Sequence, residues 1–133
     1  LDVSATLFGA TQIYGTYADT PRWSGTVYAA LTLPLPKSAG EMVLRGDLYS
    51  QTGQWFSNQG TTLSPQTFIP GYTVTNSRLE WNVGQMPLTL ALFAKHLTKE
   101  EYFTGGLASA PFGTNGVVTA EPRTYGFEAT VRF

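Results

Sequence analysis

The sequence predicts an all-β protein whose antiparallel, up-and-down strands form part of the wall of a transmembrane β-barrel. Three observations support this prediction. Segments of about eleven residues alternate between apolar and polar side chains, and the connections between them are alternately short and long. Charged residues make up only 13% of the chain, against about 25% in an ordinary soluble domain, while aromatic residues reach 14%. This composition offers few charges for a solvated surface.

The segment 123–133 shows the alternation most clearly. The residues between its apolar positions are small, polar or charged, and the apolar positions are Tyr125, Phe127, Ala129, Val131 and Phe133. A period of two over this length predicts a β-strand with one apolar and one polar face. In water, the edge of such a long amphipathic strand favours aggregation. In a membrane barrel, lipid covers the apolar face and a neighbouring strand pairs with the edge.

Five further segments show the same period, with differing regularity. Alternation is regular in 23–33, 41–51 and 72–83, but Phe8 interrupts it in the first segment. In 88–98 leucines compete with other apolar residues, so the sequence leaves open which side chains share a face. The six predicted strands are residues 2–14, 23–33, 41–51, 72–83, 88–98 and 123–133.

The connections between these strands differ systematically in length. Residues 34–40 and 84–87 are short and rich in Pro and Gly, which favour turns. The segments 14–22, 54–71 and 102–122 are longer. If each strand reverses direction, the short turns lie at one end of the sheet and the long loops at the other. This asymmetry is typical of outer-membrane barrels, and eleven tilted residues span roughly the 25 Å of their apolar band.

Aromatic side chains concentrate at the predicted long-loop ends of the strands. They are Tyr14, Trp23, Trp55, Phe56, Tyr72, Tyr102, Phe103 and Tyr125. Membrane proteins place such residues in a girdle at the interface between lipid and water. The alternative is that aromatic residues simply favour strand ends beside loops. We favour the girdle because Trp and Tyr are scarce at the strand centres.

Other protein classes are disfavoured by composition. A net charge of −1 and a pI near 5.7 give no reason to expect nucleic acid. The chain has no cysteine, so it has neither disulfides nor thiolate metal sites. The longest apolar run, 90–94, is far shorter than the roughly 18 residues of a spanning helix. Because the chain begins at Leu1 without a signal peptide, we expect it to be a mature piece or a fragment.

Three motifs in the second half of the chain resemble the C-terminal end of TonB-dependent outer-membrane receptors. They are Pro70-Gly-Tyr72 entering a strand, Leu97-Thr98 ahead of Tyr102, and Pro122-Arg-Thr-Tyr-Gly126 in a strand that closes on Phe133. The resemblance covers the chain from about residue 70; before that it is general in pattern. One position departs from the family pattern, because His96 stands where Asn usually precedes Leu-Thr.

The resemblance implies a 22-stranded barrel with an N-terminal plug in the bacterial outer membrane. Such receptors import scarce nutrients, such as ferric siderophores or cobalamin, with energy delivered through TonB. This chain supplies about six strands as a single segment, residues 1–133, with no plug domain. Six strands cannot close a membrane barrel, since the smallest known have eight. The chain is therefore expected to be a fragment of a receptor or one component of an assembled barrel.

The resemblance also implies partners. They are outer-membrane lipid, the remaining barrel strands and the plug, TonB indirectly, and the barrel assembly machinery. The end of the chain resembles the C-terminal signal that this machinery reads, through Tyr125, Phe127, Val131 and Phe133.

Catalytic patterns are absent from the sequence. The sequence shows no catalytic motif around the single histidine, His96, and a structural role explains it better than a base or ligand role. Glu100 and Glu101 are adjacent, so on a strand they point to opposite faces and cannot act as an acid/base pair. No nucleophile elbow, phosphate-binding loop or paired-histidine spacing occurs. We therefore expect no enzyme activity, no cofactor and no metal site.

Charges on two strands suggest a ladder on the polar face. If 41–51 and 72–83 pair antiparallel, Arg45 lies level with Glu80, and Asp47 lies level with Arg78. We expect these two ion pairs on the lumen side, because a charge facing lipid costs roughly 2 to 4 kcal/mol near the bilayer midplane. The alternative is that barrel stagger offsets the rows and each charge meets water.

Two functional classes remain open. In the first, the chain is a transport component whose loops 54–71 and 102–121 form part of an extracellular binding mouth. Its predicted ligand contacts are Trp55, Phe56, Tyr102 and Phe103. In the second, the chain is a non-transport binding or structural module, either a β-sandwich or an assembled barrel. A soluble sandwich would stay monodisperse without detergent, which separates the two classes.

Overall fold

The computed structural model describes residues 3–7, 10–14, 17–57, 67–109, 112 and 114–133. Apart from one 3-10 turn, η1 (Lys37–Ala39), the regular elements of this part of the chain are strands. The strand pairs with defined registers are all antiparallel. These findings confirm the all-β, antiparallel prediction. The chain divides into two compact units: residues 1–24, 51–72 and 101–120 form unit 1, and residues 25–50, 73–100 and 121–133 form unit 2.

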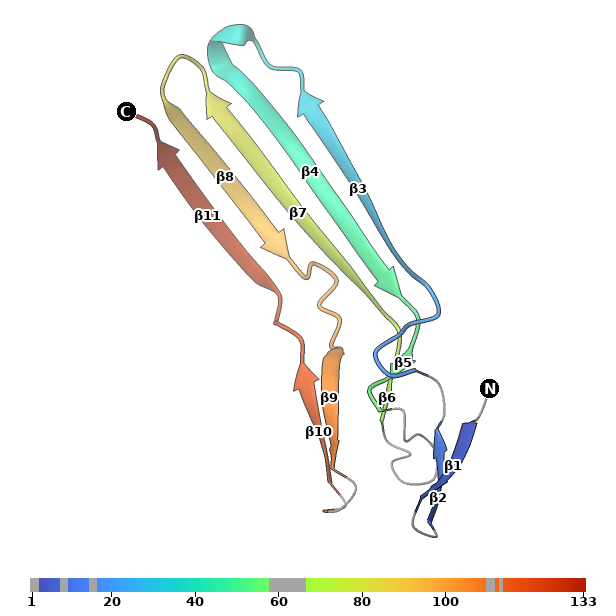
Figure 1. Cartoon of the computed structure of the whole chain (residues 1–133). Coiled ribbons are helices and arrows are strands. Elements are labelled where there is room, and N and C mark those ends of the chain that lie inside the picture. Colours follow the sequence, from blue (N-terminus) through green and yellow to red (C-terminus); the bar gives the residue numbers. More distant parts are fainter. Residues whose placement is uncertain (1–2, 8–9, 15–16, 58–66, 110–111, 113) are drawn as a thin grey trace. The chain divides into compact units, whose positions relative to one another are not determined.

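Unit 2 is an open sheet of five strands in the order β11-β8-β7-β4-β3 (Figure 1). Four of its strands begin and end within two residues of the predicted segments, where alternation is regular, whereas β8 ends earlier than predicted. Their bounds are β3 (Ser24–Leu33), β4 (Gly40–Gln51), β7 (Tyr72–Val83), β8 (Leu88–Lys95) and β11 (Thr124–Val131). Strands β3 and β11 are the two edges of the sheet.

The register resolves which side chains of β8 share a face. Leu92 pairs with Phe127 of β11 on one side and with Leu79 of β7 on the other. Directly paired residues of antiparallel strands point to the same face. Because residues two apart on a strand share a face, Leu88, Leu90 and Leu92 lie on an apolar face that Trp81 and Val131 extend. Ala91, Glu80 and Glu128 form one rung of the opposite, polar face.

Two glycines bring the short turns of unit 2 together. Gly40 has φ 95° and Gly84 has φ 41°, backbone angles that residues with a side chain rarely adopt. A Cβ at Gly40 would collide with backbone atoms of Asn82 and Gly84. The Gly84 amide and the Trp81 Nε1 both donate to the Ala39 carbonyl, at 3.2 and 2.9 Å. The two short connections therefore lie at one end of the sheet, as the pattern of loop lengths predicts.

Strand β8 ends at Lys95, three residues before the predicted end, because His96 has a left-handed backbone with φ 55°. The His96 amide donates to Oδ1 of Asn76 at 3.0 Å, and the Leu97 amide donates to the Thr75 carbonyl at 2.9 Å. Asn and His both tolerate this backbone region better than most residues. Either residue therefore suits the backbone conformation at this position.

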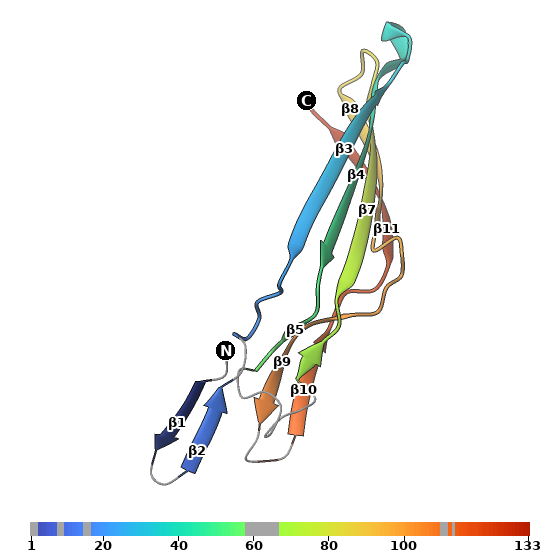
Figure 2. The ribbon, with the colours of Figure 1, turned by 90° about the vertical axis from the view of Figure 1, so that its right-hand side faces the viewer.

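The described residues of unit 1 form three strand pairs. The pair β1 (Val3–Leu7) and β2 (Ala10–Tyr14) is antiparallel, so the prediction of one strand over 2–14 is wrong. The alternation is already broken at Phe8, and the next residue in sequence, Gly9, is of a type that favours turns. The predicted loop 54–71 contains β5 (Gln54–Trp55) and β6 (Phe68–Ile69) (Figure 1). The predicted loop 102–122 contains β9 (Phe103–Ser109) and β10 (Thr114–Thr119) (Figure 2).

Few apolar side chains are buried in the described residues. They are Phe56 and Ile69 in unit 1, and Val74 and Ala91 in unit 2. The apolar face of the unit 2 sheet stays open, with Leu92 55% and Phe127 62% exposed. No second layer of unit 2 covers it. No helix in the described part of the chain is long and apolar enough to span a membrane.

Candidate functional site

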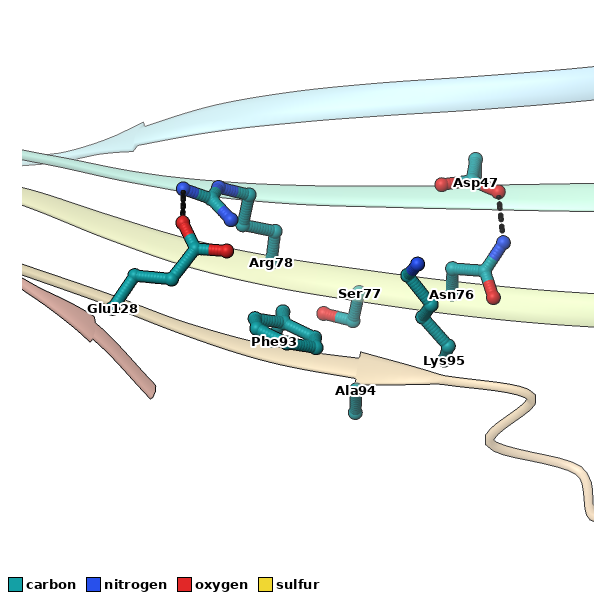
Figure 3. Close-up of a pocket in the computed structure, with 8 residues that line it drawn as sticks. All are labelled: Asp47, Asn76, Ser77, Arg78, Phe93, Ala94, Lys95 and Glu128. Atoms are coloured by element: carbon teal, nitrogen blue, oxygen red, sulfur yellow. Dashed lines mark hydrogen bonds and ion pairs between the residues drawn. The ribbon is translucent and has the colours of Figure 1, made fainter. Parts of the chain in front are cut away.

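The polar face of the five-stranded sheet carries an ion-pair network centred on Arg78 of β7. Its Nη2 donates to Oε2 of Glu128 at 2.7 Å (Figure 3). Its Nε donates to Oε2 of Glu80 at 3.4 Å. Glu80 and Glu128 both pair with Ala91 of β8, which lies between them and is only 3% exposed. The small Ala91 side chain leaves room for Arg78 to reach across β8 to β11.

The predicted ladder of Arg45 with Glu80 and Asp47 with Arg78 stays a prediction, and the contacts that the structure gives Arg78 and Asp47 are different ones. Within the described residues, both ion pairs of the network belong to Arg78, and Asp47 instead accepts a hydrogen bond from Nδ2 of Asn76 at 2.7 Å. The different lengths of the Arg78 and Asp47 side chains explain these contacts. The long guanidinium side chain extends across one strand to a second carboxylate, whereas the short Asp47 side chain reaches only its neighbour on β7.

An open groove of about 410 Å³ lies beside this network within unit 2. It is lined by Asp47, Asn76, Ser77, Arg78, Phe93, Ala94, Lys95 and Glu128. Its charged groups are of both signs, and the amide of Asn76 and the guanidinium of Arg78 already donate to carboxylates. The groove therefore combines balanced charges, two positive and two negative side chains, with the apolar groups of Phe93 and Ala94.

Phe93 is the one aromatic side chain among these lining residues. It is directly paired with Gly126 of β11, and a Cβ at Gly126 would collide with the Phe93 ring. The ring therefore lies on the glycine and covers the backbone that the missing side chain leaves open. Sequence reasoning missed this pair. An aromatic residue at a polar position of β8, opposite a glycine inside β11, is the signal that could have found it.

The predicted assembly-signal residues lie at or just beyond the apolar face of β11. Tyr125, Phe127 and Val131 alternate along the strand and are all exposed, and Phe133 follows the strand's end. Arg123 lies over the Tyr125 ring, with the guanidinium carbon 5.4 Å from its centroid. Tyr125, Phe127 and Val131 thus form one exposed apolar row along β11.

The four predicted ligand-contact aromatics have different surroundings in unit 1. Phe56 is only 7% exposed and packs against Gly106, so it serves the interior of the unit rather than a ligand surface. Trp55 and Phe68 are tilted, with centroids 5.1 Å apart. Tyr102 stacks on Tyr72 at 3.9 Å, and the structure leaves Phe103 partly exposed.

Acidic residues and His96 do not gather in the described part of the chain. No group of three or more His, Cys, Asp or Glu side chains able to hold a metal ion occurs there.

Comparison with known proteins gives a structural match and no sequence match. No family model matches the chain, and no curated protein matches it. Among solved structures, the crystal structure of BauA, the ferric preacinetobactin receptor from Acinetobacter baumannii, superimposes with a TM-score of 0.64 at 16% sequence identity. The match covers 90% of this chain and 18% of the receptor chain. This chain has the fold of that segment.

Proposed function

We propose that the chain forms part of the wall of an outer-membrane transport barrel of the TonB-dependent receptor type. In this proposal the apolar face of the unit 2 sheet contacts lipid, and the polar face with Arg78 lines the lumen. The strands β3 and β11 pair with further strands, up to the 22 that such a receptor contains. The transported nutrient is of the class that includes ferric siderophores and cobalamin. The protein resides in the bacterial outer membrane.

The open apolar face of the sheet is the observation that carries this proposal. Burying an apolar side chain stabilises a protein by about 1.5 to 3 kcal/mol, so a soluble sheet covers such a face with a second layer. Leu92, Phe127 and Val131 are all more than half exposed, and nothing else in unit 2 lies over them. Lipid can cover the apolar face of a single sheet without a second layer of protein. The fold of the matching receptor segment supports the same assignment.

The proposal extends to the partners of the chain. We propose contacts with outer-membrane lipid, with the remaining strands and plug of the receptor, and with the assembly machinery through Tyr125, Phe127, Val131 and Phe133. TonB acts indirectly, through the plug. No catalytic activity and no nucleic-acid binding are part of the proposed function.

Cysteine labelling tests the proposed membrane position, because the chain has no native cysteine. Each face offers two directly paired positions for cysteine substitution. Leu92→Cys and Phe127→Cys lie on the apolar face, and Thr89→Cys and Thr130→Cys lie on the polar face. In isolated outer membranes, we expect a water-soluble maleimide to label the two threonine positions and to leave the lipid-facing pair unreacted until detergent is added. Equal labelling of both faces in intact membranes would show a soluble sheet and refute the proposal.

A further inference from the structure

Arg45 of β4 has no carboxylate partner among the described residues of unit 2. Both ion pairs in this part of the chain belong to Arg78, and Glu80, which the sequence predicts as the partner of Arg45, is bonded to Arg78. Asp47, two residues along β4, accepts a hydrogen bond from Asn76 at 2.7 Å. Arg45 itself is exposed. Its positive charge is therefore not balanced within the described sheet.

An open groove of about 390 Å³ lies beside Arg45 within unit 2. Its lining comes from β4 and from β3, the free edge of the sheet, and comprises Tyr28, Ala29, Ala30, Arg45, Gly46 and Asp47. Tyr28 and Ala30 lie two residues apart, so they share one face of β3. No charged residue occurs in β3. A carboxylate that neutralises Arg45 from this side must therefore come from beyond β3.

Arg78 shows how an arginine of this sheet bonds across a neighbouring strand. Its Nη2 donates to Glu128 of β11 at 2.7 Å (Figure 3). The intervening strand β8 contributes Ala91, which is directly paired with Glu128 and whose small side chain lets the guanidinium pass. The distance across two strand spacings is about 10 Å.

Arg45 and Ala30 repeat this arrangement at the other edge of the sheet. Ala30 lines the groove beside Arg45, and its side chain is as small as that of Ala91. The difference is that Ala91 is covered by β11, whereas Ala30 is exposed because β3 has no described neighbour on its outer side. Arg45 thus stands as Arg78 would stand if β11 were removed from the sheet.

We propose that the strand that pairs with β3 carries Glu or Asp at the position opposite Ala30, and that Arg45 bonds to this carboxylate across Ala30. A carboxylate at this position gains an ion pair, whereas Lys or Arg there is repelled by Arg45. Edge pairing is then selected by charge as well as by backbone hydrogen bonds. As a statement about the barrel wall, this proposal rests on the receptor function proposed above. As recognition by a sheet edge, it stands on Arg45 and Ala30 alone.

Disulfide tethering to β3 tests the proposal, because the chain has no native cysteine. Leu31→Cys captures a strand peptide of about ten residues through a peptide cysteine paired with it. In an antiparallel pair, the peptide residue that follows this cysteine lies opposite Ala30. Three peptides differ only at that residue, which is Glu, Gln or Lys. The whole chain in detergent micelles is equilibrated with pairs of peptides in a thiol buffer, and mass spectrometry measures the ratio captured.

We expect the Glu peptide to be captured about two- to fivefold more than the Gln peptide, and the Lys peptide to be captured least. Arg45→Gln should abolish this preference, and it should fold because Arg45 is exposed. Lys37→Gln removes the same charge from η1, outside the groove, and should leave the preference unchanged. If Leu31→Cys fails to fold, Ala29→Cys repeats the measurement with the variable residue placed before the peptide cysteine.

Two results would overturn this proposal: equal capture of the Glu and Gln peptides, or a preference for Glu that persists in Arg45→Gln. Its failure is distinct from failure of the receptor function. If the cysteines facing lipid react with maleimide in intact membranes while β3 still selects the Glu peptide, the transport role falls and the charge selection stands. Protected cysteines together with equal peptide capture give the reverse outcome.

Discussion

Gly126→Ala is the substitution that tests most directly how the polar face of the sheet is packed. The new methyl group would collide with three atoms of the Phe93 ring on the paired strand. Overpacking of this kind costs about 1 to 3 kcal/mol. Exchanging glycine for alanine inside a strand returns about 0.5 to 1 kcal/mol. We therefore expect a net loss of stability of up to about 2.5 kcal/mol.

Gly126→Ala should stabilise the sheet instead of destabilising it once the Phe93 ring is removed. In a Phe93→Ala background nothing obstructs the methyl group, so Gly126→Ala should stabilise the sheet by about 0.5 to 1 kcal/mol. The coupling free energy between the two positions is then about 1 to 3 kcal/mol. Urea unfolding of the four proteins in detergent, followed by tryptophan fluorescence, measures it. With slopes of about 1 to 3 kcal/mol per molar urea, a coupling of about 2 kcal/mol corresponds to roughly 0.7 to 2 M in the urea midpoint.

Gly25→Ala serves as the control in this cycle. Its Cβ would meet nothing within 4 Å, so its effect on stability should be the same with and without Phe93. If Gly126→Ala stabilises both backgrounds equally, the coupling is zero. The Phe93 ring then does not lie on the glycine, and our account of the pair is wrong.

Three further predictions follow from other parts of the sheet. Gly40→Ala forces a side chain into a positive φ and against the backbone, so we expect at least about 2 kcal/mol of destabilisation, seen as a lower urea midpoint. Leu92→Lys places a charge on the face proposed to meet lipid and should lower the free energy of unfolding in vesicles by roughly 2 to 4 kcal/mol. Thr89→Lys, on the polar face, should lower it much less. Equal losses of stability would contradict the assigned faces. Arg78→Met leaves two carboxylates without their shared cation and should lower the thermal midpoint, and adding Glu128→Gln should restore part of it; no recovery would show that the network does not stabilise the sheet.

Alternation is sufficient to locate the long strands of unit 2. The segment 72–83 and β7 have the same bounds, because every second residue is apolar from Leu79 onward and no glycine interrupts the strand. The same rule fails for β9 and β10, where Gly105, Gly106 and Gly116 hide the pattern and make the hairpin look like a loop. Glycine adds neither an apolar nor a polar side chain to the alternation. The two strands are therefore recognised from their pairing in the structure.

The candidate site was less predictable than the strands. Alternation assigns Arg78 and Glu80 to the polar face, and the register agrees. It does not say which neighbour a flexible side chain reaches, so the partners of Arg78 and Asp47 emerge only from the structure. The burial of Phe56 depends likewise on Gly106, which lies fifty residues away in sequence.

The odd number of strands in the unit 2 sheet has a consequence for anything that joins it. Because direction alternates across five strands, β3 and β11 point the same way (Figure 1). Two copies of this chain inserted with the same sidedness could meet edge to edge only as parallel neighbours. A closed barrel whose strands alternate in direction throughout has an even number of strands, so an odd number of strands from outside this sheet must lie between the two edges. The two free edges of this sheet therefore require that the number of strands completing a barrel around it be odd, whichever sequence supplies those strands.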